Sequence, residues 1–147
     1  SLAYRTSTNG ISWNIPVYIF STYDEHPNIA KFNNKYYMIY EHRYTSYAGH
    51  NYVFVLKSAT SLDGISWSTQ DLITNVHDGD ANGCDWAKCG PAPYLIILED
   101  STYPYILVYN RRTNCNICER YYIKTKDFVT WTEEKPFPTS TRKLTAF

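Results

Sequence analysis

The most restrictive feature of the sequence is a seven-residue segment that occurs twice. Residues 7–13 read STNGISW and residues 61–67 read SLDGISW, so five of the seven positions are identical. A looser third copy, TKDFVTW, spans residues 125–131 and keeps the hydroxyl, the Asp and the Trp. The spacing of Trp13, Trp67 and Trp131 is too long for a helical repeat, but it suits one four-stranded blade with sizeable loops.

The repeated segment has the composition of a hairpin turn that leads into a strand. Asn9 and Asp63 each precede a glycine, and this pairing supplies the side-chain acceptor and the positive φ that a tight turn needs. The Trp then opens the next strand, where an indole is large enough to fill the space between two sheets. We therefore expect the tryptophans to be core residues at equivalent places in successive sheets.

Between the copies, the same order of strands occurs twice. Each unit starts with a proline-led apolar strand and continues with a turn, a Tyr-rich second strand, a third strand that enters the hairpin motif and a fourth that carries the Trp. The first strands are Pro27 to Phe32 and Pro93 to Leu98, the second are Tyr36 to Arg43 and Tyr105 to Arg112, and the third are Tyr52 to Ser58 and Tyr121 to Thr125. No segment shows a helical period.

This order predicts an all-β fold, a partial β-propeller of four-stranded antiparallel blades with two complete blades and half of another. Residues 1–22 would be the last two strands of one blade, 23–75 and 76–135 complete blades, and 136–147 a connection to a following element. Such a unit leaves strand edges and apolar sheet faces open. We expect the rest of a longer chain, or other copies of this one, to close the propeller.

Composition supports a folded chain and argues against two classes of partner. The 147 residues are 44% hydrophobic and 17% aromatic, which is enough apolar material for a core. Lys plus Arg and Asp plus Glu number 14 each, so no overall field attracts nucleic acid or an anionic membrane. No apolar run approaches the roughly 20 residues that span a bilayer, so membrane insertion is not expected.

Two stretches resemble a known group of enzymes. SATSLDGISW at residues 58–67, and HPNI at 26–29 followed by KYYMIY at 35–40, resemble blades of the five-bladed arabinanase, levansucrase and invertase superfamily of glycosidases. The hairpin motif is also similar to the Asp-box of sialidases. The resemblance implies an active site on the propeller axis, on the face where the fourth strand of one blade connects to the inner strand of the next. Glycosidases need paired carboxylates there.

The resemblance points to Asp24 and Asp85 as the catalytic base and an auxiliary carboxylate, because each lies just upstream of an inner strand. The candidate substrate-binding residues are Glu25, His26, Arg43, Tyr44, Trp86 and Arg112. The general acid is not assigned, although Glu41 and Glu119 are loop candidates. In the alternative interpretation the two aspartates cap turns or face solvent, the arginines form structural ion pairs, and most tyrosines pack between sheets.

One loop and two cysteine pairs suggest bound metal or disulfides. Asp78, Asp80 and Asn82 alternate before a glycine, as ligands do in calcium loops, although a polar turn uses the same residues. Calcium is therefore a possible cofactor. Cys84 with Cys89, and Cys115 with Cys118, lie on loops expected on one face. They could form two disulfides or a tetrahedral zinc site, and disulfides fit an extracellular or cell-surface location.

The function predicted from the sequence is that of a carbohydrate-active, glycoside hydrolase-like propeller that binds a glycan on its axial face. The alternative is a propeller without catalysis that binds glycans, mediates adhesion or forms part of a surface structure. Release of reducing sugar separates the first function from the second, and binding without product separates a glycan-binding module from a structural one.

Overall fold

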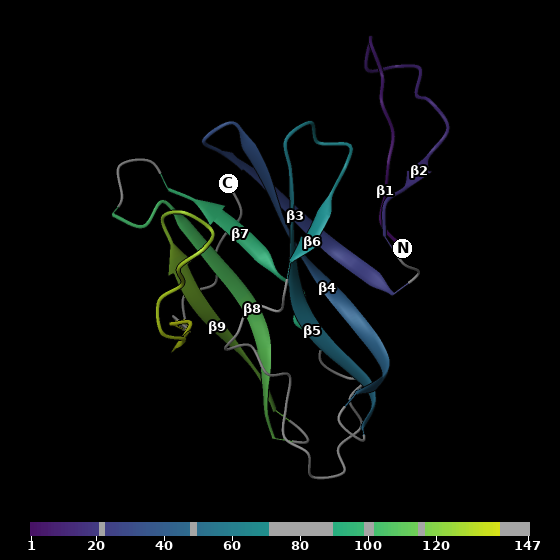
Figure 1. Ribbon diagram of the computed structural model, residues 1–147. Coiled ribbons are helices and arrows are strands. Elements are labelled where there is room, and N and C mark those ends of the chain that lie inside the picture. Colours follow the sequence, from purple (N-terminus) through teal and green to yellow (C-terminus); the bar gives the residue numbers. More distant parts are fainter. Residues whose placement is uncertain (21–22, 48–49, 71–89, 99–101, 115–116, 139–147) are drawn as a thin grey trace.

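The computed structural model describes residues 1–20, 23–47, 50–70, 90–98, 102–114 and 117–138, and this part of the chain contains strands and no helix (Figure 1). The strands are β1 (Ala3–Tyr4), β2 (Val17–Tyr18), β3 (Asp24–Phe32), β4 (Lys35–Tyr47), β5 (His50–Ser61), β6 (Ser68–Gln70), β7 (Tyr94–Ile97), β8 (Tyr105–Asn114), β9 (Ile117–Thr125) and β10 (Lys135–Pro136). Within these ranges there is no helix long and apolar enough to cross a membrane.

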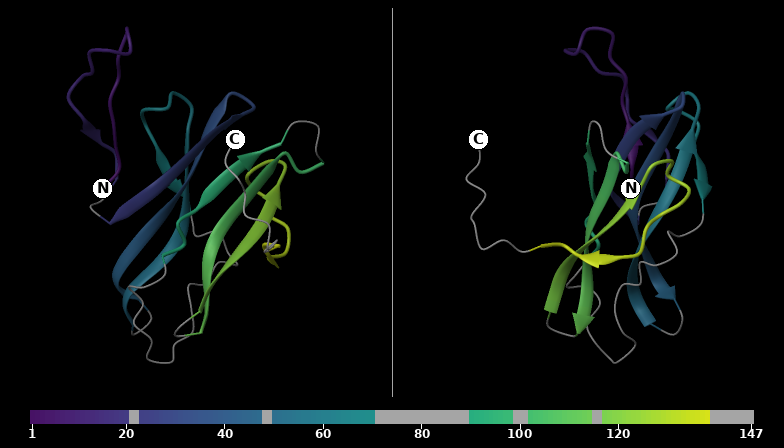
Figure 2. Two further views of the ribbon diagram at one scale, coloured as in Figure 1. Left: turned by 180° about the vertical axis from the view of Figure 1, so that it is seen from behind. Right: turned by 90° about the vertical axis from the view of Figure 1, so that its left-hand side faces the viewer.

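The strands form two four-stranded antiparallel sheets and one two-stranded sheet. The first large sheet has the order β3-β4-β5-β6, the second has the order β7-β8-β9-β10, and β1 pairs with β2. The two large sheets stand side by side with β3 and β7 as neighbours (Figures 1 and 2). Two sheets with the same strand order, in sequence, confirm the predicted succession of four-stranded blades.

The β3–β4 hairpin sets the positions of Glu25, His26 and Glu41 relative to one another. Asn33 and Asn34 form its turn with φ of 47° and 57°, the double positive φ that suits a two-residue hairpin loop. Phe32 therefore lies opposite Lys35. Further from the turn, a bulge between Glu25 and Asn28 shifts the register by one residue.

Apolar residues of both large sheets meet in one core. It contains Ala30, Ile39 and Leu56 from the first sheet and Tyr105, Leu107, Tyr109, Ile123 and Phe128 from the second. The other face of the first sheet has its own cluster, in which Phe20 stacks on Tyr40 at 4.9 Å between ring centres. Each face of the first sheet is thus covered by a different part of the chain, as in a series of blades.

The hairpin turn after β5 shows how the repeated motif works. Gly64 has a φ of 75°, and its N–H donates to the Ser61 hydroxyl at 2.8 Å. Asp63 Oδ1 accepts from the N–H groups of Ile65 and Ser66, each at 2.8 Å. These bonds hold the pKa of Asp63 well below its ordinary value, because they stabilise the ionised carboxylate.

The other two copies make the same bonds with their own residues. Asn9 Oδ1 accepts from the N–H groups of Ile11 and Ser12, and Asp127 Oδ1 accepts from those of Val129 and Thr130. In the third copy Phe128 takes the place of the glycine with a φ of 61°. The hydroxyl and the Asn or Asp side chain, which make the bonds, are therefore enough to close the turn.

The structure differs from the sequence-based prediction at several points. Trp67 and Trp131 pack against the two cores, but Trp13 is 56% exposed because the sheet that its hairpin joins has only two described strands. β9 begins at Ile117, before the predicted strand, so Glu119 lies in a strand and not in a loop. Glu41 is also not in a loop, because it lies in β4 within the predicted second strand. The fourth strands β6 and β10 begin after Trp67 and Trp131.

Candidate functional site

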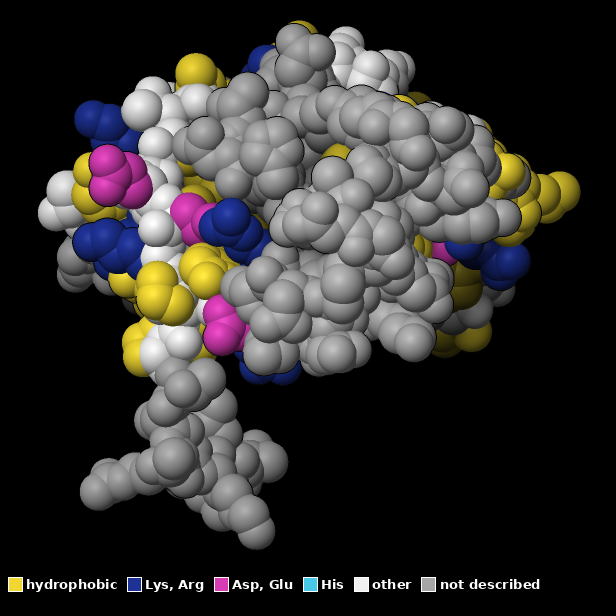
Figure 3. Space-filling view, turned by 90° about the horizontal axis from the view of Figure 1, so that it is seen from below, with side chains coloured by type: hydrophobic (Ala, Val, Ile, Leu, Met, Phe, Trp, Pro, Cys, Tyr) yellow, Lys and Arg dark blue, Asp and Glu magenta, His cyan; other side chains and the backbone are white. Residues whose placement is uncertain are grey.

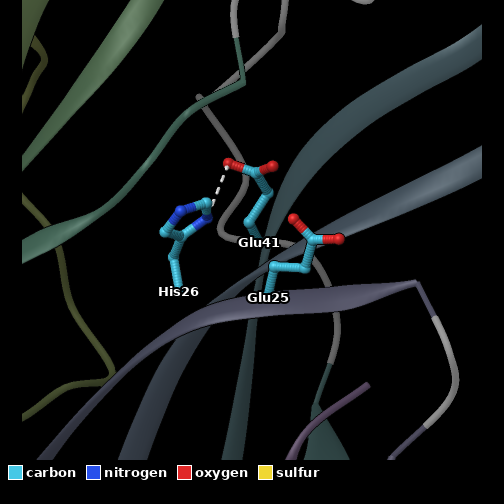
Figure 4. A group of neighbouring side chains, drawn as sticks. All are labelled: Glu25, His26 and Glu41. Carbon is cyan, nitrogen blue, oxygen red and sulfur yellow. Dashed lines mark ion pairs between the residues drawn. The ribbon is translucent and has the colours of Figure 1, made fainter.

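Two glutamates lie directly opposite each other where β3 begins. Beyond the bulge, Glu25 of β3 is paired with Glu41 of β4, so their side chains leave the same face of the sheet. One oxygen of each carboxylate and a ring nitrogen of His26 all lie within 4.8 Å of one another (Figure 4). Like charges opposite each other destabilise a sheet, so the pair requires an explanation.

The bulge residue His26 completes this group. It has a φ of 51°, an uncommon value for a non-glycine residue, and its Nδ1 lies 3.7 Å from Glu41 Oε2. Its side chain is 56% exposed, whereas that of Glu41 is 4% exposed. Glu25 is exposed as well. The group therefore combines one buried carboxyl with an exposed carboxylate and an exposed imidazole.

The surroundings of Glu41 favour its protonated form. Burial raises the pKa of Glu41, and the nearby Glu25 raises it further. The N–H of Ala92, which donates to Oε2 at 2.8 Å, and the charge of His26 act in the opposite direction and are outweighed by burial. Two neighbouring carboxyls in such unlike environments are the arrangement that separates an acid from a base.

The segment that enters the second sheet lies against Glu41. A Cβ at Gly90 would be 2.7 Å from Oε1 of Glu41, so any larger residue at this position would push the carboxyl aside. The N–H of Asn110 in β8 donates to the Pro91 carbonyl at 2.7 Å and fixes the same segment from the other side. The site is therefore built from both sheets.

Asp24, the predicted catalytic base, points to the opposite face of the first sheet. It is paired with His42, and His42 Nδ1 lies 2.6 Å from Asp24 Oδ1. Asp24 is 4% exposed, and the ring of Tyr44 packs edge-on against His42 at 4.4 Å. The structure thus brings Glu25, His26 and Glu41 together and separates them from Asp24 by the thickness of the sheet.

Two other predicted binding residues pack on aromatic or charged neighbours. The Arg43 guanidinium lies 5.0 Å from the centre of the Tyr23 ring, and the Lys57 ammonium lies 4.9 Å from that of Tyr44. The remaining predicted residues lie outside the described ranges or have side chains that are not described: Asp78, Asp80, Asn82, Cys84, Asp85, Trp86, Cys89, Arg112, Cys115 and Cys118. The calcium, disulfide and zinc hypotheses stay predictions.

A hollow at the other end of the first sheet is a poorer candidate. It has a volume of about 400 Å³ and is lined by turn residues that include Lys35, Asp63 and Ser66. Asp63 is its carboxylate, and the turn hydrogen bonds described above already hold that carboxylate in its ionised form. It is therefore unsuited to proton transfer at neutral pH.

No protein-family model matches the sequence, and no curated protein matches it either. Solved structures do match. One match has a TM-score of 0.56 and 18% identity and covers 79% of this chain. It is described as concerning the GH130 family of mannoside phosphorylases, which contains glycoside hydrolases that target beta-1,2 mannosidic linkages in Candida mannan. A glycosyl hydrolase from Bacteroides ovatus gives a TM-score of 0.55 and 16% identity over 77% of this chain.

The chain has a partial β-propeller fold. It spans 32% and 31% of the two matched chains, so it corresponds to about a third of such a molecule. Within the propeller, Glu25, His26 and Gly90 lie where the chain enters the inner strands β3 and β7. This is the position at which the sequence resemblance predicts the active site.

The surface charge and the spacing of possible ligand atoms bear on whether the site could hold an ion. On the face seen in Figure 3, acidic and basic side chains lie next to each other with hydrophobic ones between them, so no field of one sign covers its described part. The Glu25, His26 and Glu41 atoms are close enough to surround a cation. The Ala92 N–H already donates to Oε2 of Glu41, which leaves Oε1 as the oxygen of this carboxyl without that bond.

Proposed function

We propose that this propeller cleaves glycosidic bonds at the Glu25–Glu41 pair, with Glu41 as general acid and Glu25 as its carboxylate partner. The observation that carries the proposal is the cross-strand pairing of an exposed and a buried glutamate at the entry of the inner strands. Glycoside hydrolysis needs such a pair, one carboxyl protonated and one ionised. The similarity to glycosidase propellers supports it.

The spacing of the pair indicates how the reaction proceeds. One oxygen of each carboxyl lies within 4.8 Å of the other, which is below the roughly 6.5 to 9.5 Å of inverting glycosidases and favours a retaining course. In the first step Glu41 gives its proton to the leaving oxygen while Glu25 bonds to the anomeric carbon. In the second step a water molecule, which loses its proton to Glu41, releases the sugar from Glu25.

The experiment is incubation of the protein with a panel of polysaccharides that begins with beta-linked mannans, because one matched structure is described as acting on beta-1,2 mannosidic linkages. We expect release of reducing sugar whose first-formed anomer has the configuration of the substrate, as NMR measures it. Product of inverted configuration would remove Glu25 from the role of nucleophile. Binding of glycans with no product would contradict the proposal and favour a glycan-binding propeller.

A further inference from the structure

The side chain of Asn28 crosses from one blade to the next. Its Nδ2 donates to the Pro93 carbonyl at 2.7 Å, and its Oδ1 accepts from the N–H of Leu95 at 3.0 Å. Asn28 belongs to β3, whereas Pro93 and Leu95 flank the start of β7. The same Nδ2 also donates to the His26 carbonyl at 3.2 Å, so one amide links the bulge residue to a backbone acceptor and a backbone donor of the next blade.

The segment that Asn28 holds has a backbone conformation that needs outside support. Ala92 has a φ of 39°, in the left-handed region, which is unfavourable for a residue other than glycine. This conformation accompanies the 2.8 Å hydrogen bond from the Ala92 N–H to Glu41. Because Pro93 is the next residue, the bonds from Asn28 act directly on this conformation.

We infer that Asn28 is a positioning residue for Glu41, acting through the backbone from Ala92 to Leu95. Its link to Glu41 is geometric and can be measured without substrate, while its bearing on catalysis rests on the proposed function. Among the described residues, the titratable groups that face Glu41 are Glu25 and His26 of β3. The residue opposite Glu41 in β5 is Leu56, which does not titrate. Because Asn28 also donates to the His26 carbonyl, the Ala92 amide signal reports on the segment, and the Glu41 titration reports on the segment and His26 together.

The test follows the Ala92 amide and the Glu41 carboxyl by NMR as pH is varied. In the wild type, the Ala92 amide signal is expected to shift with the same midpoint as the Glu41 carboxyl. In Asn28→Ala we expect the amide to lose this shift. The pKa of Glu41 should fall, because the carboxyl loses burial when the segment moves away, and burial outweighs the Ala92 hydrogen bond.

Three further variants sharpen the test. Gly90→Ala should also uncouple the amide, because the added Cβ displaces the Glu41 carboxyl. Asn14→Ala is the matched control, because Asn14 bonds to Thr6 in the hairpin between β1 and β2, outside both large sheets. In this variant the Ala92 amide should still titrate with Glu41. Asn28→Ser retains one hydroxyl and replaces Asn28→Ala if that variant does not fold, with the same loss expected in weaker form.

An Ala92 amide that still titrates with Glu41 in Asn28→Ala overturns the inference. So does an unchanged pKa of Glu41, because the segment would then have kept its place beside the carboxyl. The proposed function can fail separately. If the variants change the Ala92 and Glu41 titrations as expected but the protein releases no sugar, the proposed hydrolase activity is contradicted. The positioning role of Asn28 is then still supported.

Discussion

Replacing Glu41 by glutamine is expected to lower kcat/KM for glycoside hydrolysis by about 10² to 10⁴-fold, the usual contribution of a general acid. Glutamine keeps the shape of the side chain and can still accept the Ala92 N–H, but it has no acidic proton to give. The wild-type rate should fall as pH rises through the pKa of Glu41, which burial raises. Rates of both proteins across pH measure the effect.

The same substitution is expected to stabilise the protein at neutral pH. Because the pKa of Glu41 is raised in the folded state, the folded protein binds this proton more tightly than the unfolded chain does, and stability is lost as pH rises through the folded pKa. Glutamine removes that loss and the repulsion from Glu25, roughly 0.2 to 1 kcal/mol for a like-charge cross-strand pair. The gain should vanish in acid, below the unfolded pKa.

The matched control is Glu133→Gln, which removes an exposed carboxylate elsewhere. It should change neither the rate nor the free energy of unfolding. A Glu41→Gln protein that keeps the wild-type rate would show that Glu41 is not the acid. One that is less stable at neutral pH would show that the carboxyl serves the fold.

Truncating Phe128 to alanine is expected to lower the free energy of unfolding by about 3 to 5 kcal/mol. The ring stacks on Tyr37 at 4.7 Å and meets Tyr105 at 4.3 Å between ring centres, so it joins the two sheets. Its φ of 61° costs roughly 1 to 2 kcal/mol, less than the packing contributes. This difference explains why an aromatic residue can occupy the position that glycine holds in the other two turns.

Phe128→Gly separates the two effects, because it removes the ring and also the conformational cost. It should be less destabilising than Phe128→Ala by about 1 kcal/mol. Val129→Ala is the control, since Val129 is 75% exposed, and it should change stability by less than about 0.5 kcal/mol. Chemical denaturation of the variants measures the differences. A loss below about 1 kcal/mol in Phe128→Ala would contradict the role of the ring between the sheets.

Much of the fold could be predicted because the residues that close its turns act locally. Asn33 and Asn34 favour a two-residue hairpin, and the hydroxyl and the Asn or Asp of each motif bond to backbone within three residues. The extents of the strands could not be predicted, because pairing with a neighbour lengthens them. The exposure of Trp13 depends likewise on which strands lie beside it.

The site was harder to predict because it depends on register. Counting back from the Asn33–Asn34 turn places His26 opposite Glu41, and only the bulge brings Glu25 there. It also turns Asp24 to the other face. The buried state of Glu41 comes from the distant segment around Gly90, which no local pattern reveals. A run of polar residues before an inner strand was the available signal, and it indicated the stretch of chain that contains Glu25 and His26.

The most direct measurement is the NMR titration of the Glu41 side-chain carboxyl in the wild type and in Glu25→Gln. We expect a wild-type midpoint above the ordinary value of 4.5, and a lower midpoint in the variant because the neighbouring negative charge is gone. A wild-type midpoint at or below 4.5, or one that does not respond to Glu25→Gln, would contradict a coupled acid and carboxylate at the entry of the inner strands.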